Sequence, residues 1–469
     1  MTKKAVYIFP SNTIEPLTSL GKIPLISYQI ALPAHLNDII IITDGNTKLL
    51  EDYLLCAHPD KKILAIKSAS RLRNIPAYSQ EIINLTDQPS TSFYIIFGNY
   101  FLNSFLSTDD NNWVSESIIH VLDHQSFWTR LKKQKRLDKA VADYKKVKMD
   151  CLDLSNPKIL SQVRDYLKND TDQEYDFSKP EEAIYFPGNR VVKYFQDEKI
   201  IKTRAARTKF LNGLTPVLDR VGLNYYSYQN VPGKTIYESL SSGITIRFLH
   251  WCSSRLWDAQ KPRLTHQQAL NFFQACAKFY KIKTEERINH YWNSVSNQDR
   301  TSLVNGRQTP TLNELINLVD WDYLCQGTPV RFHGDLQFDN VLFSPGRNPE
   351  FILLDWRQDF AGLIEYGDIY YDLAKLYGGL IIPYSSIKKN KFSFSQVGST
   401  VEISLHPPPY LQVARQEFQE FINAKKYDKK KIQLLTGIIF INMSPLHHEP
   451  FNHFLHHLGK LMLAQVLHA

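Results

Sequence analysis

The chain reads HGDLQFDN from His333 to Asn340, ILLDW from Ile352 to Trp356 and GDIYYDLAKL from Gly367 to Leu376. These three motifs decide the fold of its C-terminal part. Asp335 lies in a polar turn between two short apolar runs of strand type, PVRF and VLF, where its carboxylate can face an incoming hydroxyl. Asn340 ends this turn and Asp355 follows another apolar run, so two oxygen ligands can converge on Mg²⁺ at the phosphates of a nucleotide. The segment therefore contains the parts that phosphoryl transfer requires.

The same motifs resemble those of the aminoglycoside phosphotransferase and choline kinase superfamily. HGDLQFDN matches the catalytic loop HxDxxxxN of that family, and LLDW matches its metal-binding segment. The resemblance implies an α+β, two-lobed, protein-kinase-like fold that uses ATP and Mg²⁺. It also implies that Asp335 is the catalytic base and that Asn340 and Asp355 hold Mg²⁺. His333 would pack beneath the loop as a structural residue.

Two further aspartates lie in GDIYYDLAKL, and both have a simple structural interpretation. Asp368 precedes the helix predicted for YYDLAKLY, and Asp is a common residue at helix N-caps. For Asp372 the family pattern suggests a second role, which is to brace the catalytic loop from behind. We therefore expect Asp372 to support the site without acting on the substrate.

Length and composition fit an enzyme of two domains. The chain has 469 residues, which is more than one typical domain, and 43% of them are hydrophobic, enough for sizeable cores. The N-terminal stretch MTKKAVYIFPSN has too short an apolar run for a signal peptide, and no segment approaches membrane-spanning length. The five cysteines are scattered, without a CxxC pair. We expect a cytoplasmic protein with no membrane insertion, disulfide or structural zinc.

The formal net charge of +8 raises the possibility of a nucleic-acid partner. The basic clusters are short, from Arg130 to Lys139 and from Lys425 to Lys431, and each is interrupted as solvated helix faces commonly are. We therefore expect no nucleic-acid binding. A net positive charge is also compatible with an enzyme that attracts nucleotides or phosphorylated ligands.

Residues 1–170 alternate short apolar strands (AVYIF, DIIIIT, SFYIIF) with helical stretches, which predicts a parallel α/β sheet. This domain resembles the Rossmann-like sugar-nucleotide and phosphocholine nucleotidyltransferases. The resemblance rests on three segments: Glu15–Ile30 at the substrate-binding position, Ser92–Phe101 at a strand that ends in Gly-Asp in the family, and Cys151–Leu167 at the closing segment. It places Asp153 at a metal position.

Two departures from that family predict an inactive domain. FPSNTIEPL (Phe9–Leu17) stands where the family has a glycine-rich loop and a catalytic Arg, and close approach of the backbone to phosphate requires glycine. Asn99 stands where the family has a metal-binding Asp. An unrelated small α/β domain is the alternative interpretation.

The polar stretch NDTDQEYDFSKPEE (Asn169–Glu182) marks a linker, and residues 171–235, which begin within it, resemble a kinase N-lobe. Lys193 lies in the second of two strand-like runs, AIYF and RVVKYF, and is the candidate to bind ATP phosphates, although a lysine in a strand more often faces solvent. A hinge after the next strand would offer backbone groups near Gln229 and Val231 to the adenine ring.

The family usually anchors this lysine with a helical Glu, and here KTRAARTKFLNGL (Lys202–Leu214) offers Arg and Lys instead. Either Lys193 is held otherwise, or Arg204 or Arg207 meets phosphate.

Residues 236–469 read as mostly helical and correspond to the C-lobe. Aromatic faces bind quaternary ammonium groups, so a choline-like acceptor is chemically reasonable. Large aromatics at helical spacing are, however, more often core residues. Five of the seven tryptophans lie in this part: Trp251, Trp257, Trp292, Trp321 and Trp356.

Together these features predict an ATP-dependent kinase for a small-molecule hydroxyl acceptor, either an amino alcohol of the choline or ethanolamine type or a sugar. Such a pair of domains resembles enzymes that decorate bacterial surface and capsule polysaccharides. A bifunctional kinase and nucleotidyltransferase is one alternative, opposed by Asn99 and the missing glycine-rich loop. A non-catalytic nucleotide-binding module is the other, opposed by the intact set of Asp335, Asn340 and Asp355.

Overall fold

The computed structural model describes residues 4–9, 15–20, 23–32, 36–45, 47–67, 92–102, 111–122, 124–134, 137–168, 182–186, 189–195, 197–258, 262–295 and 299–468. Within these ranges the chain is a mixed α/β structure of two compact units. The first unit contains the described residues up to 168 together with 182–198 and 218–230, and the second contains 199–217 and 231–468. Every helix in the described ranges is too short or too polar to cross a lipid bilayer.

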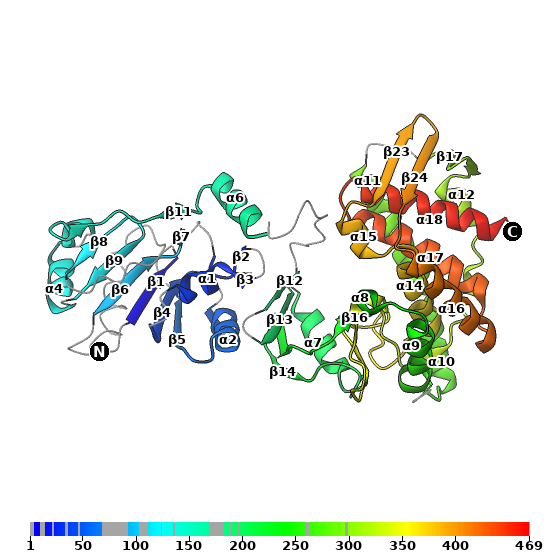
Figure 1. Cartoon of the computed structure of the whole chain (residues 1–469), viewed down its shortest axis with the longest axis horizontal. Helices are drawn as coiled ribbons and strands as arrows, with labels where there is room; N and C mark the ends of the chain where they lie inside the picture. The colour runs from blue at the N-terminus through cyan, green and yellow to red at the C-terminus, as the bar shows by residue number, and fades with distance from the viewer. Residues whose placement is uncertain are drawn as a thin grey trace. The chain divides into compact units, whose positions relative to one another are not determined.

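A seven-stranded sheet is the centre of the first unit (Figure 1). Its strands, in spatial order, are β10 (Lys145–Lys146), β8 (Trp113–Val114), β9 (Ile118–Val121), β6 (Phe93–Phe97), β1 (Lys4–Ile8), β4 (Asp38–Thr43) and β5 (Lys62–Lys67). β6, β1, β4 and β5 run parallel, as the alternation of strands and helices predicts, and β9 is antiparallel to β6.

Alternating side chains of these strands fill two cores, because successive residues of a strand point to opposite faces. Ala5 and Tyr7 lie in one core and Val6 and Ile8 in the other. The helices of this unit are α1 (Leu25–Ala31), α2 (Thr47–Ala57), α4 (His124–Gln134), α5 (Leu137–Ala140) and α6 (Pro157–Lys168). Two small ladders complete it: β2 (Ser19–Leu20) with β3 (Ile23–Pro24), and β7 (Tyr100–Leu102) with β11 (Cys151–Asp153).

A second, antiparallel sheet also belongs to the first unit. Its strands are β12 (Glu182–Tyr185), β13 (Arg190–Phe195), β15 (Tyr225–Gln229) and β14 (Leu218–Val221). Tyr185, Val192 and Tyr225 share a core with residues of α2. The Tyr225 hydroxyl donates to the carbonyl oxygen of Asp52 at 2.8 Å, and the ring of Tyr185 meets that of Tyr53 edge to face at 5.7 Å. The strands that the sequence assigns to a kinase N-lobe are thus packed on α2.

The second unit is largely helical, and in its core α14 (Ile369–Ile381) packs on α17 (Lys429–Met443), which packs on α18 (Phe451–Leu467). Glycine allows α17 and α18 to approach closely: a Cβ at Gly459 would lie 2.9 Å from the carbonyl oxygen of Gly437. The other helices are α7 (Glu198–Arg207), α8 (Ile236–Ser239), α9 (Ile244–Trp251), α10 (His266–Ala277), α11 (Lys283–Ser294), α12 (Leu312–Asn317), α13 (Trp321–Cys325), α15 (Tyr384–Lys388) and α16 (Tyr410–Lys425).

Short ladders in the second unit bring the three motifs together. One ladder joins β16 (Lys234–Thr235), β20 (Val341–Phe343) and β21 (Phe351–Leu353), and another joins β19 (Pro329–Val330) and β22 (Gly367–Asp368). A third sheet contains β18 (Arg307–Thr309), β17 (Ser302–Val304), β24 (Thr400–Leu405) and β23 (Phe392–Val397). HGDLQFDN connects β19 to β20, Asp355 lies just after β21, and α14 follows β22. The antiparallel pairing of Val341 with Leu353 places Asn340 beside the segment of Asp355.

Candidate active site

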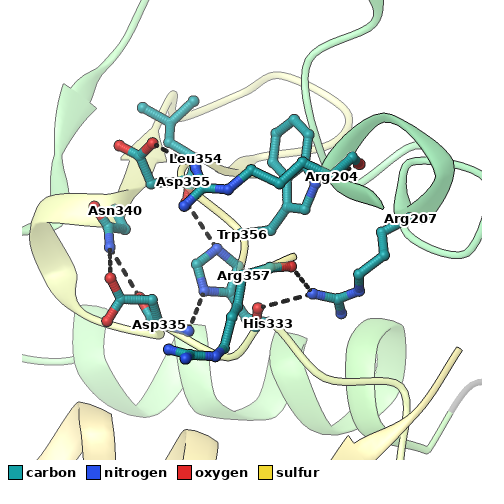
Figure 2. A network of polar contacts seen from close by, with 9 residues as sticks. All are labelled: Arg204, Arg207, His333, Asp335, Asn340, Leu354, Asp355, Trp356 and Arg357. Carbon is teal, nitrogen blue, oxygen red and sulfur yellow. Dashed lines mark hydrogen bonds and ion pairs between the residues drawn. The ribbon is translucent and has the colours of Figure 1, made fainter. Parts of the chain in front are cut away.

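His333 joins the two segments that carry the predicted catalytic and metal-binding residues (Figure 2). It is fully buried, and its Nε2 lies 2.7 Å from the carbonyl oxygen of Leu354, while its Nδ1 accepts from the backbone N–H of Asp335 at 3.1 Å. Because a carbonyl oxygen only accepts, Nε2 donates and the ring is neutral. Burial lowers the pKa of His333 to about 4, which agrees with a neutral ring.

Two left-handed backbone conformations shape the loop. Gly334 has φ +88°, and a Cβ there would lie 2.6 Å from the Cβ of Arg357. Asp355 has φ +56°, which is uncommon for a residue with a side chain. Two backbone hydrogen bonds hold it, from Leu354 to the Asn340 carbonyl at 2.8 Å and from Arg357 to the His333 carbonyl at 3.0 Å. Strain of this kind persists only where the surroundings enforce it.

Asp335 is held by three side chains and is open to solvent on one side. Its Oδ1 lies 2.7 Å from Nζ of Lys375 and accepts from Nε2 of Gln337 at 3.3 Å, and its Oδ2 accepts from Nδ2 of Asn340 at 3.3 Å. The side chain is 37% exposed, so a small molecule can reach it. Desolvation raises the pKa of Asp335, but the charge of Lys375 outweighs it and the pKa falls to about 2. Asp335 is therefore a carboxylate that can accept a hydrogen bond from a hydroxyl and orient it.

Lys375 lies within the third motif, but no role in the site is predicted for it from the sequence. Desolvation lowers its pKa, but the charge of Asp335 raises it further, so the net pKa is raised and the ion pair is stable. A signal was present in the sequence, since Lys375 follows Asp372 by three residues on one helix and such residues share a face. Lys375 also lines a small cavity beside the loop with Gln337, Tyr384 and apolar side chains of α17.

Asn340 and Asp355 have the chemistry of Mg²⁺ ligands. The amide nitrogen of Asn340 donates to the Asp335 carbonyl at 2.9 Å, which leaves its Oδ1 on the opposite side of the amide. No group of three or more His, Cys, Asp or Glu side chains in the described part of the chain could hold a metal by itself. Mg²⁺ is often bound by one or two protein ligands together with substrate phosphates and water, so this pair fits a metal that arrives with a nucleotide.

Helix α7 presents arginines to this site. Arg204 Nη1 lies 3.6 Å from Oδ1 of Asp355. Arg207 is fully buried, and its guanidinium donates to the carbonyl oxygens of Phe332, His333, Arg357 and Ile364. The interpretation that Arg207 meets phosphate is therefore wrong, because all three of its nitrogens are used on the backbone of the loop. Arg204 remains a candidate.

Helix α14 supports the loop from its N-terminal turns. Asp372 is fully buried and accepts from the backbone N–H of His333 at 2.9 Å, from that of Gly334 at 2.7 Å and from Nε1 of Trp257 at 3.1 Å. Asp368 caps α14 by accepting from the Tyr370 N–H at 3.2 Å, as its position predicts. Trp257 and Trp356 are buried within the protein, so these two rings offer no face to a cationic acceptor.

The residues predicted to bind ATP lie in different parts of the structure. Lys193 is in the middle of β13, 3% exposed, and its neighbour Val192 points to the opposite face, toward α2. Gln229 ends β15, and its side chain donates to Asp219 at 3.1 Å. Lys193 and Gln229 belong to the first unit, whereas Val231 and Asp335 belong to the second. Their roles in nucleotide binding stay predictions.

The first unit brings Asn99 and Asp153 together, as the nucleotidyltransferase resemblance implies. The Asn99 amide nitrogen donates to Oδ1 of Asp153 at 3.0 Å, and the backbone N–H of Ser155 donates to the same oxygen at 2.9 Å. A single carboxylate occupied by two donors is a poor counterpart of a two-aspartate metal site. Residues 10–14 of the predicted phosphate-loop position lie outside the described residues.

Comparisons with known proteins assign the chain to no family. No family model and no curated protein matches it. The solved structures that resemble it include a 4-diphosphocytidyl-2C-methyl-D-erythritol synthase from Anaerococcus prevotii, with 11% identity, a TM-score of 0.31 and coverage of 36% of this chain and 96% of that chain. An inositol-1-phosphate CTP transferase from T. maritima has 9% identity, a TM-score of 0.29 and coverage of 36% and 98%. A Plasmodium vivax ethanolamine kinase has 12% identity, a TM-score of 0.34 and coverage of 66% and 91%.

Proposed function

We propose that this protein is an ATP- and Mg²⁺-dependent phosphotransferase that phosphorylates a hydroxyl group of a small molecule. The observation that carries the proposal is the environment of Asp335. Its carboxylate is ionised, accessible and fixed by Lys375, Gln337 and Asn340. Asn340, in turn, lies beside the segment of Asp355.

In the proposed reaction the acceptor hydroxyl donates a hydrogen bond to Asp335, which aims its oxygen at the γ-phosphorus of ATP. The bond from that phosphorus to the ADP oxygen breaks, the bond to the acceptor oxygen forms, and the hydroxyl proton passes to Asp335. Because the pKa of Asp335 is about 2, proton transfer comes late, when the oxygen is already bonding to phosphorus. Lys375 places a positive charge beside the phosphoryl group as it is transferred. Mg²⁺ held by Asn340 and Asp355 would neutralise phosphate charge.

The proposal gives the first unit no catalytic step. The hydrogen bond from Asn99 to Asp153 argues against a nucleotidyltransferase activity of this unit. If the purified protein did transfer a nucleotidyl group, it would release pyrophosphate from CTP. Lys193, Gln229 and Val231 remain the residues proposed to bind ATP. Since ATP is a cytoplasmic donor, we place the reaction in the cytoplasm, at a step that supplies a phosphorylated precursor for surface polysaccharide.

The test is to incubate the protein with Mg-ATP and a panel of sugars, sugar acids, alcohols and amino alcohols while measuring ADP release and product mass. We expect acceptor-dependent ADP, and we expect Asp335→Asn to lower its rate by about 10²–10⁴-fold, because Asn cannot take the proton. ATP affinity should be unchanged in this variant. Asp322→Asn, at an exposed carboxylate on α13, is the matched control.

Phosphoryl transfer that continues undiminished in Asp335→Asn would contradict the mechanism. Tight binding of ATP without turnover on any acceptor would favour a nucleotide-binding module instead.

A further inference from the structure

Four basic side chains form a cluster, and three of them interact with the charge of Asp335. Lys375 is paired with it at 2.7 Å. The other three are Lys283 and Arg287 of α11 and Arg357, two residues after Asp355. None of these three forms an ion pair with any residue that the structure describes. These three positive charges therefore have no ion-pair partner within the described residues, although they lie beside the proposed reaction centre.

The positions of these side chains converge. Nζ of Lys283 lies 4.3 Å from the centre of the Phe279 ring, and Cζ of Arg357 lies 4.8 Å from the centre of the same ring. Arg287 follows Lys283 by four residues on α11, so the two project from the same face of the helix. Nε of Arg357 is buried without a hydrogen-bond partner.

The titration behaviour of the cluster reflects this crowding. Burial, followed by the charges of Arg357, Arg287 and Lys375, lowers the pKa of Lys283 well below its usual value, and Asp335 opposes the shift. Burial and the charge of Arg357 also lower the pKa of Arg287. Partly buried charges of one sign repel each other unless a counter-charge joins them. An anion bound among them would relieve the repulsion.

We propose that the phosphoryl acceptor is an anion, a hydroxyl compound that carries a carboxylate or phosphate group. Its negative group binds Lys283, Arg287 and Arg357 while its hydroxyl reaches Asp335. This inference rests on the proposed kinase function, and it decides between the two acceptor classes that the sequence leaves open. An amino alcohol would place its positive charge among three cations that form no ion pair within the described residues, and the carboxylate of Asp335 is already paired with Lys375. A sugar that bears an acidic group fits.

The first experiment tests the anion site without any knowledge of the acceptor. Inorganic phosphate is titrated into the full-length protein by calorimetry in the presence of saturating Mg-ADP, which fills the nucleotide site. We expect binding to the wild type and a Kd raised about tenfold or more in Lys283→Met and in Arg287→Met, because each loses a charge-assisted contact. Lys281→Met, at an exposed lysine two residues before Lys283, should bind phosphate like the wild type.

Two results of this titration would overturn the inference. One is the absence of phosphate binding, or an equal Kd in all four proteins. The other is a parallel loss of Mg-ADP affinity in Lys283→Met and Arg287→Met, because the cluster would then serve the nucleotide.

The second experiment compares three-carbon acceptors that carry a neutral, positive or negative group at one end: glycerol, 3-amino-1,2-propanediol, glycerate and glycerol 3-phosphate. We expect kcat/KM to be highest for one of the two anions, which also separates carboxylate from phosphate, and lowest for the amine. Lys283→Met should reduce the preference for the anion over glycerol by about tenfold.

A higher kcat/KM for the amine than for the anions would overturn the proposal of an anionic acceptor and would leave the proposed kinase function intact. No transfer to any of these compounds, or to the wider panel, would contradict the kinase function itself, and phosphate binding would then report on the anion site alone.

Discussion

At the scale of single residues, the buried imidazole of His333 makes stability depend on pH. Its pKa is about 4 in the folded protein, against 6.5 for an exposed histidine. Because His333 binds a proton more tightly in the unfolded chain, its contribution to the free energy of unfolding is complete above pH 6.5 and is lost as the pH falls through 4. The full effect is about 3 kcal/mol. We expect the difference in free energy of unfolding between wild type and His333→Asn to shrink by nearly that amount between pH 7 and 4.5, measured by urea denaturation.

His290→Asn is the control substitution, because His290 is exposed on α11. A difference between wild type and His333→Asn that stays constant over this pH range would show that His333 is not held neutral.

The residues of the site differ in how far the sequence reveals them. Motif spacing is enough to group Asp335, Asn340 and Asp355, because the turn and the strand pair that carry them are local structures. Lys375 could have been found from its helical spacing to Asp372. The anion-binding role proposed for Lys283 has no local signal, because Lys283 and Asp335 are far apart in the sequence and only the tertiary fold brings them near each other.

At the scale of elements, α7 places Arg204 beside Asp355, a residue proposed to bind Mg²⁺. Arg204 lies 3.6 Å from Asp355, whose side chain is 33% exposed. An ion pair as exposed as this contributes about 0–1 kcal/mol, so its competition with Mg²⁺ is modest. We expect Arg204→Gln to lower the Mg²⁺ concentration that gives half-maximal activity by about two- to fivefold. The measurement is the rate as a function of free Mg²⁺ at saturating ATP.

Arg190→Gln is the control for this variant, because Arg190 pairs with Asp219, away from the metal residues. A raised KM for ATP with unchanged Mg²⁺ dependence would show instead that Arg204 binds phosphate.

Elements with a strong local pattern are the ones that the sequence predicts. β1, β4 and β6 are continuous apolar runs and form the parallel core of their sheet, and Asp368 caps α14. The partner of β13 is harder to predict. Val192 and Lys193 alternate between two faces, and the sequence does not show that the Val192 face packs on α2 rather than facing solvent.

At the scale of the whole molecule, β12, β13 and β15 share a core with the N-terminal part of the first unit, and this has a consequence for truncation. Removal of residues 1–181 would expose Tyr185, Val192 and Tyr225, which are at most 4% exposed in the full chain. Each such side chain contributes about 1.5–3 kcal/mol when buried, so the sum is comparable with the stability of a typical domain. We expect the chain that begins at residue 182 to aggregate or to unfold at a markedly lower temperature, measured by light scattering and thermal denaturation.

Two substitutions that make the newly exposed face polar test whether the loss of this core causes the instability of the shortened chain. Tyr185→Thr with Tyr225→Thr should improve the solubility of the shortened chain, because the exposed face becomes polar while threonine keeps the strands intact. The same pair should destabilise the full chain, where it removes the edge-to-face contact of Tyr185 with Tyr53 and the hydrogen bond from Tyr225 to Asp52. A shortened chain that is monomeric and as stable as the full protein would show that residues 1–170 are a separate domain, as the sequence alone predicts.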